Sequence, residues 1–329
     1  MKTFVLGLDG GGTKTAVTAM DLNGQILFEF TAGAININGE DNANVQKNMA
    51  EIFLRLSEQV NSLPGSEVAG NSLTSARTYA PDGLKACLAL CIGAAGVSNP
   101  KAAACLEMAV RHGGYGGPVS IKGDHEAALY GALKKPWGMI LIAGTGSICY
   151  GKTRLNESHR TGGFGYLIDD EGSGYAIGRD ILSAVVRAYD GRCPETALTP
   201  MVYDRLKLTD IGELIGFVYS GKTNKRDIAA LSPLLTQALS QQDPAALDIA
   251  EKSSLELVKL VVPVAERLKL ESGELALAGS ILLKDPYIRK AFEEKLRLAL
   301  PGIKTLSPAG SAAYGAALMA RDMLKSTAY

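Results

Sequence analysis

The chain opens with three short apolar runs that are separated by two turns. Residues 4–8 lead to Asp9 and three glycines, residues 16–20 form the second run, and residues 26–30 form the third. Asn23 and Gly24 lie between the second and third runs, and Asn-Gly between apolar runs is typical of a tight hairpin turn. The pattern predicts three strands joined by tight turns.

A weaker copy of this opening follows about 135 residues later, and repetition of a structural unit is the sequence signature of duplication. Residues 138–143 form an apolar run, residues 144–147 form a glycine-rich turn, and residues 148–151 form a second short run. The pattern predicts an internal duplication that gives two related lobes. The alternative is coincidence, since turns after strands are commonly rich in glycine.

Elsewhere strands alternate with helical periodicity, which predicts a mixed α/β fold. The last helix begins near residue 310 and is rich in small residues, which allow close packing against another backbone. We expect an N-terminal lobe over residues 1–117, completed by the helix at 310–329, and a C-terminal lobe over 118–309. Further strands are expected at 89–92, 119–122 and 275–278, and helices at 45–54, 100–112, 285–298 and over most of 180–270.

The composition narrows the class of protein. Among 329 residues, Lys plus Arg (34) balance Asp plus Glu (34), whereas a protein that binds nucleic acid or an anionic membrane normally carries excess positive charge. No apolar run approaches the ~20 residues of a membrane span, and the N-terminus reaches Asp9 too soon for a signal peptide. The five cysteines form no C-x-x-C pair, as expected of reduced thiols. We expect a cytoplasmic protein.

The first turn has the chemistry of a phosphate-binding hairpin. Glycines permit backbone N–H groups to converge on a phosphate oxygen, and Asp9 at the end of a strand can hold hydrated magnesium. The spacing fits neither the Walker loop nor the dinucleotide-binding loop. A purely structural glycine hairpin is the alternative. The candidate phosphate ligands are Gly11, Gly12, Thr13, Lys14 and Thr15.

The second turn offers a matching set of donors. Taken with the first hairpin, it would supply hydrogen bonds to a polyphosphate from both sides. Its candidate phosphate ligands are Gly144, Thr145, Gly146 and Ser147.

Asp124 is the candidate catalytic base. It follows the strand that ends at Gly123, where a carboxylate can accept the proton of an attacking hydroxyl during phosphoryl transfer. The alternative role is an N-cap for the helix that follows. We interpret the neighbouring His125 as an ordinary surface residue.

Residues 162–174 form a candidate sugar-binding loop. Five glycines are interspersed with aromatic residues and three acids, which is poor material for a core. Aromatic faces pack on sugar rings, and carboxylates bind paired hydroxyls. A glycine-rich surface loop ahead of a helix is the alternative.

Together these motifs resemble the N-acetylglucosamine kinase and BadF/BadG/BcrA/BcrD-type ATPase family, within the actin–hexokinase–heat-shock-70 ATPase superfamily. Residues 6–15 and 141–147 resemble the two phosphate motifs of the family, residues 277–280 its adenosine motif, and residues 163–173 its sugar-kinase signature. The resemblance spans nearly the whole chain, in the family's order.

The resemblance implies two ribonuclease-H-like (actin-like ATPase) lobes around an ATP cleft, and a homodimer. It implies that Asp9 positions Mg²⁺, through water, that Asp124 is the base, and that Gly279 and Ser280 contact the adenosine. The implied sugar-binding residues are Asn36, Asn38, Gly163, Phe164 and Asp170.

The activity implied is transfer of phosphate from ATP to the primary hydroxyl of an amino sugar, foremost N-acetylglucosamine. Glucosamine, N-acetylmuramic acid and glucose stay open, because Phe164 replaces the family's tryptophan and Asp169 its glycine. The chain lacks the zinc-binding cysteine cluster of the repressor–kinase relatives. The alternatives are an ATP-driven activator of an acyl-CoA dehydratase and an ATPase switch module.

Overall fold

The computed structural model describes residues 2–36, 42–62 and 82–326. The chain divides into two compact units, one formed by Met1–Pro136 with Pro308–Tyr329 and the other by Trp137–Ser307. Each unit is built around its own five-stranded sheet.

The first sheet has the strand order β3-β2-β1-β4-β5. The two opening hairpins are antiparallel, whereas β4 and β5 run parallel to β1. The three strands predicted at the start of the chain are therefore confirmed. The strands are β1 (Phe4–Gly10), β2 (Lys14–Met20), β3 (Ile26–Gly33), β4 (Cys87–Ala94) and β5 (Val119–Gly123).

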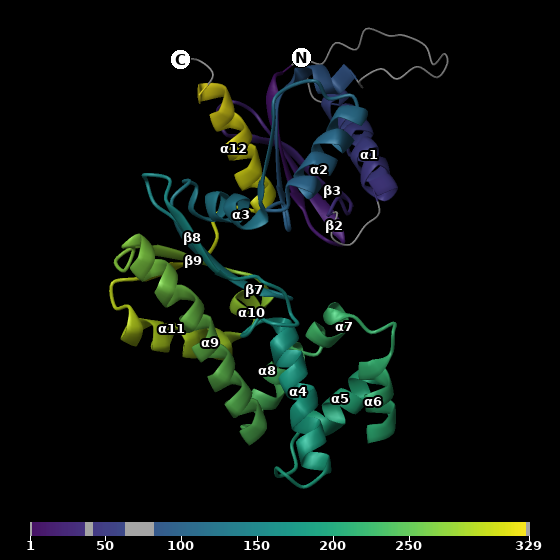
Figure 1. Cartoon of the computed structure of the whole chain (residues 1–329), viewed down its shortest axis with the longest axis vertical. Helices are drawn as coiled ribbons and strands as arrows, with labels where there is room; N and C mark the ends of the chain where they lie inside the picture. Colours follow the sequence, from purple (N-terminus) through teal and green to yellow (C-terminus); the bar gives the residue numbers. More distant parts are fainter. Residues whose placement is uncertain (1, 37–41, 63–81, 327–329) are drawn as a thin grey trace. The chain divides into compact units, whose positions relative to one another are not determined.

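Helices cover both faces of this sheet (Figure 1). The helices α1 (Asn42–Asn61) and α2 (Pro100–His112) pack on one face, where Leu6 and Leu8 are buried. The helices α3 (Asp124–Leu133) and α12 (Ala312–Ser326) cover the face that carries Val5. A short 3₁₀ turn, η1 (Asp82–Ala86), precedes β4.

The last helix belongs to the first unit, as its small residues explain. A Cβ atom added at Gly315 would lie 1.9 Å from the carbonyl oxygen of Ala127, and one at Gly7 would lie 2.2 Å from that of Ala313. Real atoms cannot approach so closely, so α12 can contact both α3 and β1 only where side chains are absent.

The boundary between the compact units differs from the expected lobe boundary at residue 117. Strand β5 pairs with β4, and α3 packs against α12, so residues 118–136 associate with the first unit. The division expected from the sequence places both elements in the C-terminal lobe.

The second sheet has the order β8-β7-β6-β9-β10, which repeats the order of the first sheet strand for strand. The duplication that the repeated hairpin predicts agrees with this topology. The sequence pattern does not predict two of its strands, because β8 (Ser158–Gly162) is polar and β10 (Lys304–Leu306) has only three residues. The strands are β6 (Gly138–Ala143), β7 (Ser147–Lys152), β8 (Ser158–Gly162), β9 (Glu274–Ala278) and β10 (Lys304–Leu306).

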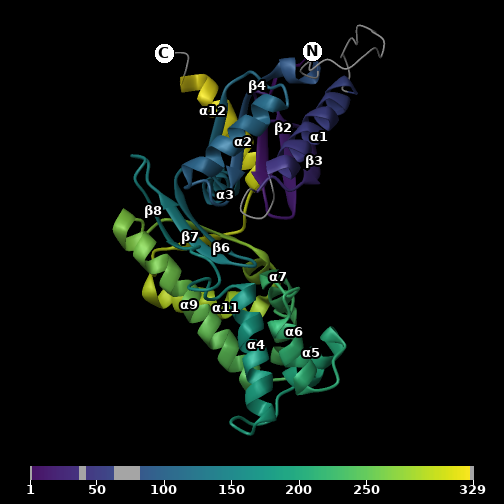
Figure 2. The same cartoon turned by 45° about the vertical axis from the view of Figure 1, so that its right-hand side comes forward.

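The long helix α9 (Pro244–Leu268) packs along this second sheet, and α11 (Pro286–Ala299) packs against α9 (Figure 2). The intervening helices extend from the sheet and share its apolar core. None of the helices in the described part of the chain is long and apolar enough to cross a membrane. The remaining helices are α4 (Gly174–Tyr189), α5 (Leu198–Leu206), α6 (Ile211–Tyr219), α7 (Lys225–Ala229), α8 (Pro233–Ser240) and α10 (Ser280–Lys284).

Candidate active site

The parallel strands of the first sheet bring two acidic residues to the same edge. Gly10 of β1 lies beside Ala94 of β4, which lies beside Gly123 of β5. Asp9 is the penultimate residue of β1, and Asp124 follows β5 directly. Both predicted carboxylates therefore lie at the carboxyl edge of this sheet, where α/β proteins commonly bind ligands.

Glycine at position 93 allows Asp124 to approach the sheet. A Cβ atom at Gly93 would lie 2.7 Å from that of Ala127 and 3.6 Å from the Cα of Asp124. The first turn of α3 therefore rests on the backbone of β4, the strand between Asp9 and Asp124.

The pKa values of the two carboxyl groups are shifted in opposite directions. Burial and the charge of Asp124 together raise the pKa of Asp9 to about 6, although Lys14 opposes both effects. Burial would also raise the pKa of Asp124, but hydrogen bonds and the charge interaction with His125 lower it below its ordinary value. Asp124 is therefore ionised at neutral pH and can accept a proton.

His125 is the partner of Asp124, so its interpretation as an ordinary surface residue is wrong. Its backbone N–H donates to Oδ1 of Asp124 at 2.8 Å, and its ring Nδ1 lies 3.3 Å from the same oxygen. The His125 side chain is only 15% exposed. Gly123, rather than Asp124, occupies the N-cap position of α3, and its N–H donates to Glu126.

The first hairpin joins β1 to β2 through residues 11–13. Thr13 and Lys14 are exposed at its tip, as a phosphate ligand requires, and the N–H of Gly11 donates to the carbonyl oxygen of Asp9. Thr15 behaves differently: its hydroxyl is buried and donates to the carbonyl oxygen of Gly33 at 2.7 Å. The Thr15 side chain therefore holds β2 to β3 in this structure.

Two candidate sugar ligands follow β3. Asn36 lies three residues beyond Gly33, the end of that strand. Asn38 lies outside the described residues. The sugar-binding role of both residues stays a prediction.

In the second unit, the glycine-rich loop is bonded directly to the second hairpin. The N–H of Ser147 donates to Oδ1 of Asp170 at 3.1 Å, and its hydroxyl donates to the carbonyl oxygen of Glu171 at 2.7 Å. A Cβ atom at Gly146 would lie 2.8 Å from the same Oδ1, so a side chain there would displace the Asp170 carboxylate. The Ser147 side chain and Asp170, expected at phosphate and sugar respectively, therefore bond to each other's segments.

The environment of Asp170 is that of a structural anchor. Its side chain is 5% exposed, and its φ of +68° is unusual for a residue other than glycine. Burial raises the pKa of its carboxyl group, although the hydrogen bond from Ser147 lowers it. The role of Asp170 in binding a sugar stays a prediction.

Helix α4 begins against the same hairpin. The N–H groups of Gly174 and Tyr175 donate to the carbonyl oxygens of Gly144 and Thr145, at 2.7 and 3.2 Å. Ser173 caps the helix by accepting from Ala176. The positive end of the helix dipole therefore lies beside the hairpin, where it favours an anion.

Phe164 lies on an ordered turn of the loop. Its ring is 61% exposed and is covered on one side by the guanidinium of Arg160, 4.8 Å from the ring centroid. Its N–H donates to Oδ2 of Asp169 at 2.9 Å, and Gly163 and Gly165 have φ of +74° and +100°. Asp169, which departs from the family pattern, thus closes the turn that presents the aromatic ring.

A cavity of about 260 Å³ connects the second hairpin with the expected adenosine motif. Gly279 has a φ of +87°, and a Cβ atom there would lie 2.2 Å from the carbonyl oxygen of Ala143, so glycine lets β9 turn beside β6. The segment at 226–233 was missed by sequence analysis because it carries no motif. The cavity is lined by Gly144, Thr145, Gly174, Arg226, Ala229, Ala230, Ser232, Pro233 and Ser280.

The site residues fit a magnesium ion that keeps much of its water. Burial and the charge of Asp124 disfavour a charged Asp9, so a cation beside this carboxylate would offset an unfavourable charge. Among the residues that the structure describes, no group of three or more His, Cys, Asp or Glu could hold a metal. Asp9, water and phosphate oxygens would be the ligands, as is usual for Mg²⁺.

Two sheets of equal strand order, each opening with a glycine-rich hairpin, define the fold of the actin-like ATPases. The sequence pattern of the BadF/BadG/BcrA/BcrD ATPase family matches residues 6–320. The chain belongs to this family.

Relatives of similar length are sugar kinases. An N-acetylmuramic acid/N-acetylglucosamine kinase of Clostridium acetobutylicum is 32% identical over 97% of this chain and 98% of its own. An N-acetyl-D-glucosamine kinase of Dictyostelium discoideum is 30% identical over 98% and 99%. A Chromobacterium violaceum protein, provisionally described as an N-acetylglucosamine kinase, has the same fold with a TM-score of 0.75, at 24% identity over 96% and 98%.

Proposed function

We propose that the chain is an ATP-dependent kinase that phosphorylates the primary hydroxyl of an amino sugar, foremost N-acetylglucosamine. The observation that carries this proposal is the position of Asp124 at the carboxyl edge of the first sheet, the same edge that carries Asp9, with His125 bonded to its carboxylate. Transfer of phosphate to a sugar gains from a carboxylate that orients the hydroxyl and accepts its proton. The kinase names of two full-length relatives support the same reading.

ATP would occupy the cavity of the second unit. Its adenosine would lie between Ser280 and the segment at 226–233, so that its phosphates extend toward the hairpin of Gly144 and Thr145. The first hairpin, with Lys14 exposed at its tip, would contribute further donors. Mg²⁺ held by Asp9 would neutralise charge on the phosphates.

The protein's own contribution to the reaction would be positioning and charge stabilisation. His125 lowers the pKa of Asp124 and contacts one of its carboxylate oxygens, Oδ1, through its backbone N–H and its ring Nδ1. The Asp124 side chain is 47% exposed, which leaves it accessible to an acceptor hydroxyl. Phosphoryl transfer is loose, so a weakly basic carboxylate suffices to accept the proton late in the reaction.

The acceptor would bind through Asn36, Asn38 and the turn that contains Gly163 and Phe164. The exposed Phe164 ring offers an apolar face to a sugar ring. Balanced charge and reduced thiols support a cytoplasmic location, and the family resemblance supports a homodimer.

An ADP-release assay over N-acetylglucosamine, glucosamine, N-acetylmuramic acid and glucose tests this proposal. We expect rapid ADP release only with a sugar acceptor present, dependence on Mg²⁺, and a product phosphorylated at the primary hydroxyl. ATP hydrolysis at the same rate with and without every sugar would contradict the proposal and would favour an ATPase switch.

A further inference from the structure

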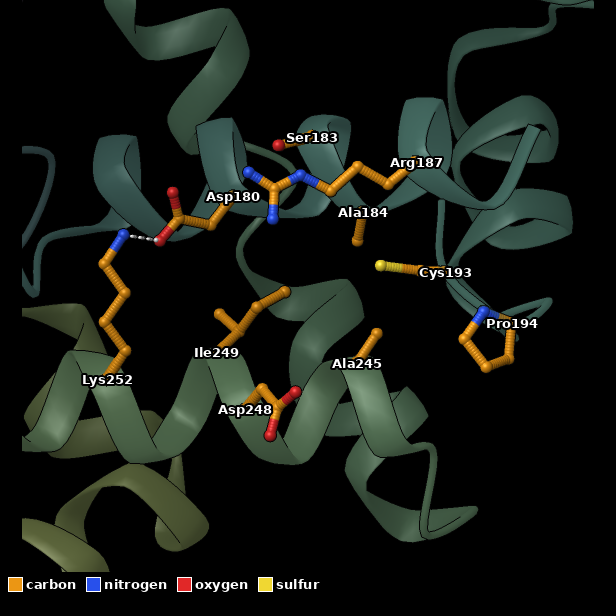
Figure 3. A pocket seen from close by; sticks show the side chains of 10 residues that line it. All are labelled: Asp180, Ser183, Ala184, Arg187, Cys193, Pro194, Ala245, Asp248, Ile249 and Lys252. Carbon is orange, nitrogen blue, oxygen red and sulfur yellow. Dashed lines mark hydrogen bonds and ion pairs between the residues drawn. The ribbon is translucent and has the colours of Figure 1, made fainter. Parts of the chain in front are cut away.

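Arg179 of α4 links two carboxylates that come from different segments. Its Nη2 lies 3.0 and 3.1 Å from the two carboxylate oxygens of Glu171, in the glycine-rich loop. Its Nε and Nη2 also donate to Oδ1 of Asp180, at 3.3 and 3.2 Å. The other oxygen of Asp180 accepts from Nζ of Lys252 on α9 at 2.7 Å (Figure 3). We call these four side chains the α4 charge network.

The inner end of the network lies next to the second hairpin. The backbone carbonyl of Glu171 accepts the Ser147 hydroxyl, and the preceding residue, Asp170, accepts the Ser147 N–H. The following residue, Gly172, has a φ of +76°, and a Cβ atom there would lie 2.8 Å from Cγ of Leu257 on α9. The backbone of the loop at Gly172 thus packs against Leu257 of α9, and the Glu171 carboxylate binds Arg179 of α4.

The network is more than a set of isolated surface pairs. Isolated exposed ion pairs contribute little to the stability of a protein, because water screens the charges and both side chains lose conformational entropy. Here one guanidinium serves two carboxylates, and Asp180, at 16% exposure, serves two cations. Burial would lower the pKa of Arg179, but Asp180 and Glu171 raise it above its ordinary value. Two cations balance two anions, so the network has no excess charge with which to bind a ligand of its own.

We propose that Arg179 is a positioning residue for the nucleotide. By fixing Glu171 it holds the Ser147 hydroxyl, and with it the hairpin of Gly144 and Thr145, in the geometry that receives the phosphates of ATP. Arg179 does not line the cavity beside that hairpin, so it acts through Glu171. The inference rests on the proposed function in taking ATP as the nucleotide.

The test compares Arg179→Met with Arg179→Lys, and uses Lys259→Met as the matched control. Lys259 forms an exposed pair with Glu256 on α9 at 2.7 Å, outside the network. Calorimetry with a non-hydrolysable ATP analogue, without acceptor, measures nucleotide binding directly. Steady-state kinetics then separates the KM for ATP from the KM for the sugar.

In Arg179→Met we expect the Kd for the ATP analogue and the KM for ATP to rise roughly three- to tenfold. A tenfold rise corresponds to about 1.4 kcal/mol of binding free energy. Arg179→Lys keeps the charge but cannot span both carboxylates, so it should restore part of the loss. In Arg179→Met the KM for the sugar should stay within about twofold of the wild type. In Lys259→Met the Kd for the ATP analogue and the KM for ATP should also stay within about twofold, as expected for a residue outside the network. Glu171→Gln, which keeps the backbone carbonyl, provides a second test if Arg179→Met does not fold.

Unchanged nucleotide binding in Arg179→Met, or equal losses for nucleotide and sugar, would overturn the positioning role. A failure of the proposed function looks different. In that case no sugar would be phosphorylated by the wild type, while the calorimetric comparison would still decide the role of Arg179.

Discussion

At the scale of single residues, neighbours decide the chemistry of identical side chains. Asp9 and Asp124 lie at the same edge of one sheet, yet burial raises the pKa of Asp9 to about 6, whereas His125 lowers that of Asp124. The first is suited to accept a compensating cation and the second to stay charged as a base. Thr15 and Asp170, which were expected to bind ligands, instead form hydrogen bonds that join two segments of the protein.

Replacing Asp124 by Asn should abolish sugar phosphorylation. An amide keeps the size of the side chain but cannot accept the hydroxyl proton, so we expect kcat to fall by at least ~10²-fold while ATP binding changes little. Stopped assays for sugar phosphate, with calorimetry for ATP, would measure both quantities. Asp204→Asn, at an 84% exposed position, is the control. Wild-type turnover in Asp124→Asn would exclude Asp124 as the base.

The raised pKa of Asp9 gives a signed pH dependence of stability in the metal-free protein. The folded state holds the proton up to a pH of about 6, but the unfolded chain releases it near 3.8. The contribution of the Asp9 carboxyl group to the free energy of unfolding is therefore complete below about pH 4. It is lost as the pH rises through 6. Between pH 5 and pH 7 the loss should be roughly 1 kcal/mol of unfolding free energy.

Chemical denaturation of wild type and Asp9→Asn at pH 5 and pH 7, without metal, measures this dependence. The variant should gain stability relative to wild type as the pH rises. Mg²⁺ with ATP should then stabilise the wild type more than the variant. A constant difference between the two proteins at both pH values would contradict the account of Asp9.

At the scale of secondary-structure elements, glycine controls which elements can touch. Gly315 permits α12 to contact α3, and Gly279 permits the turn after β9 to pass beside β6. The α4 charge network acts at the same scale, because it joins the glycine-rich loop to α4 and α4 to α9.

Gly315→Ala should destabilise the first unit strongly. Its Cβ would lie 1.9 Å from the carbonyl oxygen of Ala127, so α12 must move away from α3, and we expect a loss of roughly 2–4 kcal/mol. Gly216→Ala in α6 is the matched control, because no atom lies within 4 Å of its added Cβ and alanine favours helix. Thermal denaturation of the two variants would compare them. Equal melting temperatures would show that α12 does not pack as described.

At the scale of the whole molecule, the repeated strand order divides the site residues between two units. Asp9, Asp124 and the first hairpin belong to one unit, and the cavity with the second hairpin belongs to the other. The expectation that both hairpins grip a single triphosphate in an ATP cleft stays a prediction, as do the expected lobe boundary and the homodimer.

Thiol reactivity should report on the integrity of both units. Burial raises the pKa of Cys87 and Cys91 to about 12 and raises that of Cys149 as well, while Cys193 is exposed. A thiol-specific reagent at pH 8 should therefore modify Cys193 first and reach these three only on unfolding, since the thiolate is the reactive form. Peptide mapping after partial labelling identifies the sites. Rapid modification of Cys149 in the native protein would contradict the burial of β7.

The amino-acid sequence by itself determined the repeated hairpins, most helices, the family and the position of Asp124, because these depend on local patterns of glycines, apolar residues and turns. It could not predict that Thr15, Asp170 and the Ser147 side chain bond within the protein. Nor could it predict that His125 bonds to Asp124 and lowers its pKa, or that residues 226–233 line a cavity. These features were decided by tertiary structure, because hydrogen-bond partners and burial depend on segments that lie far apart in the chain.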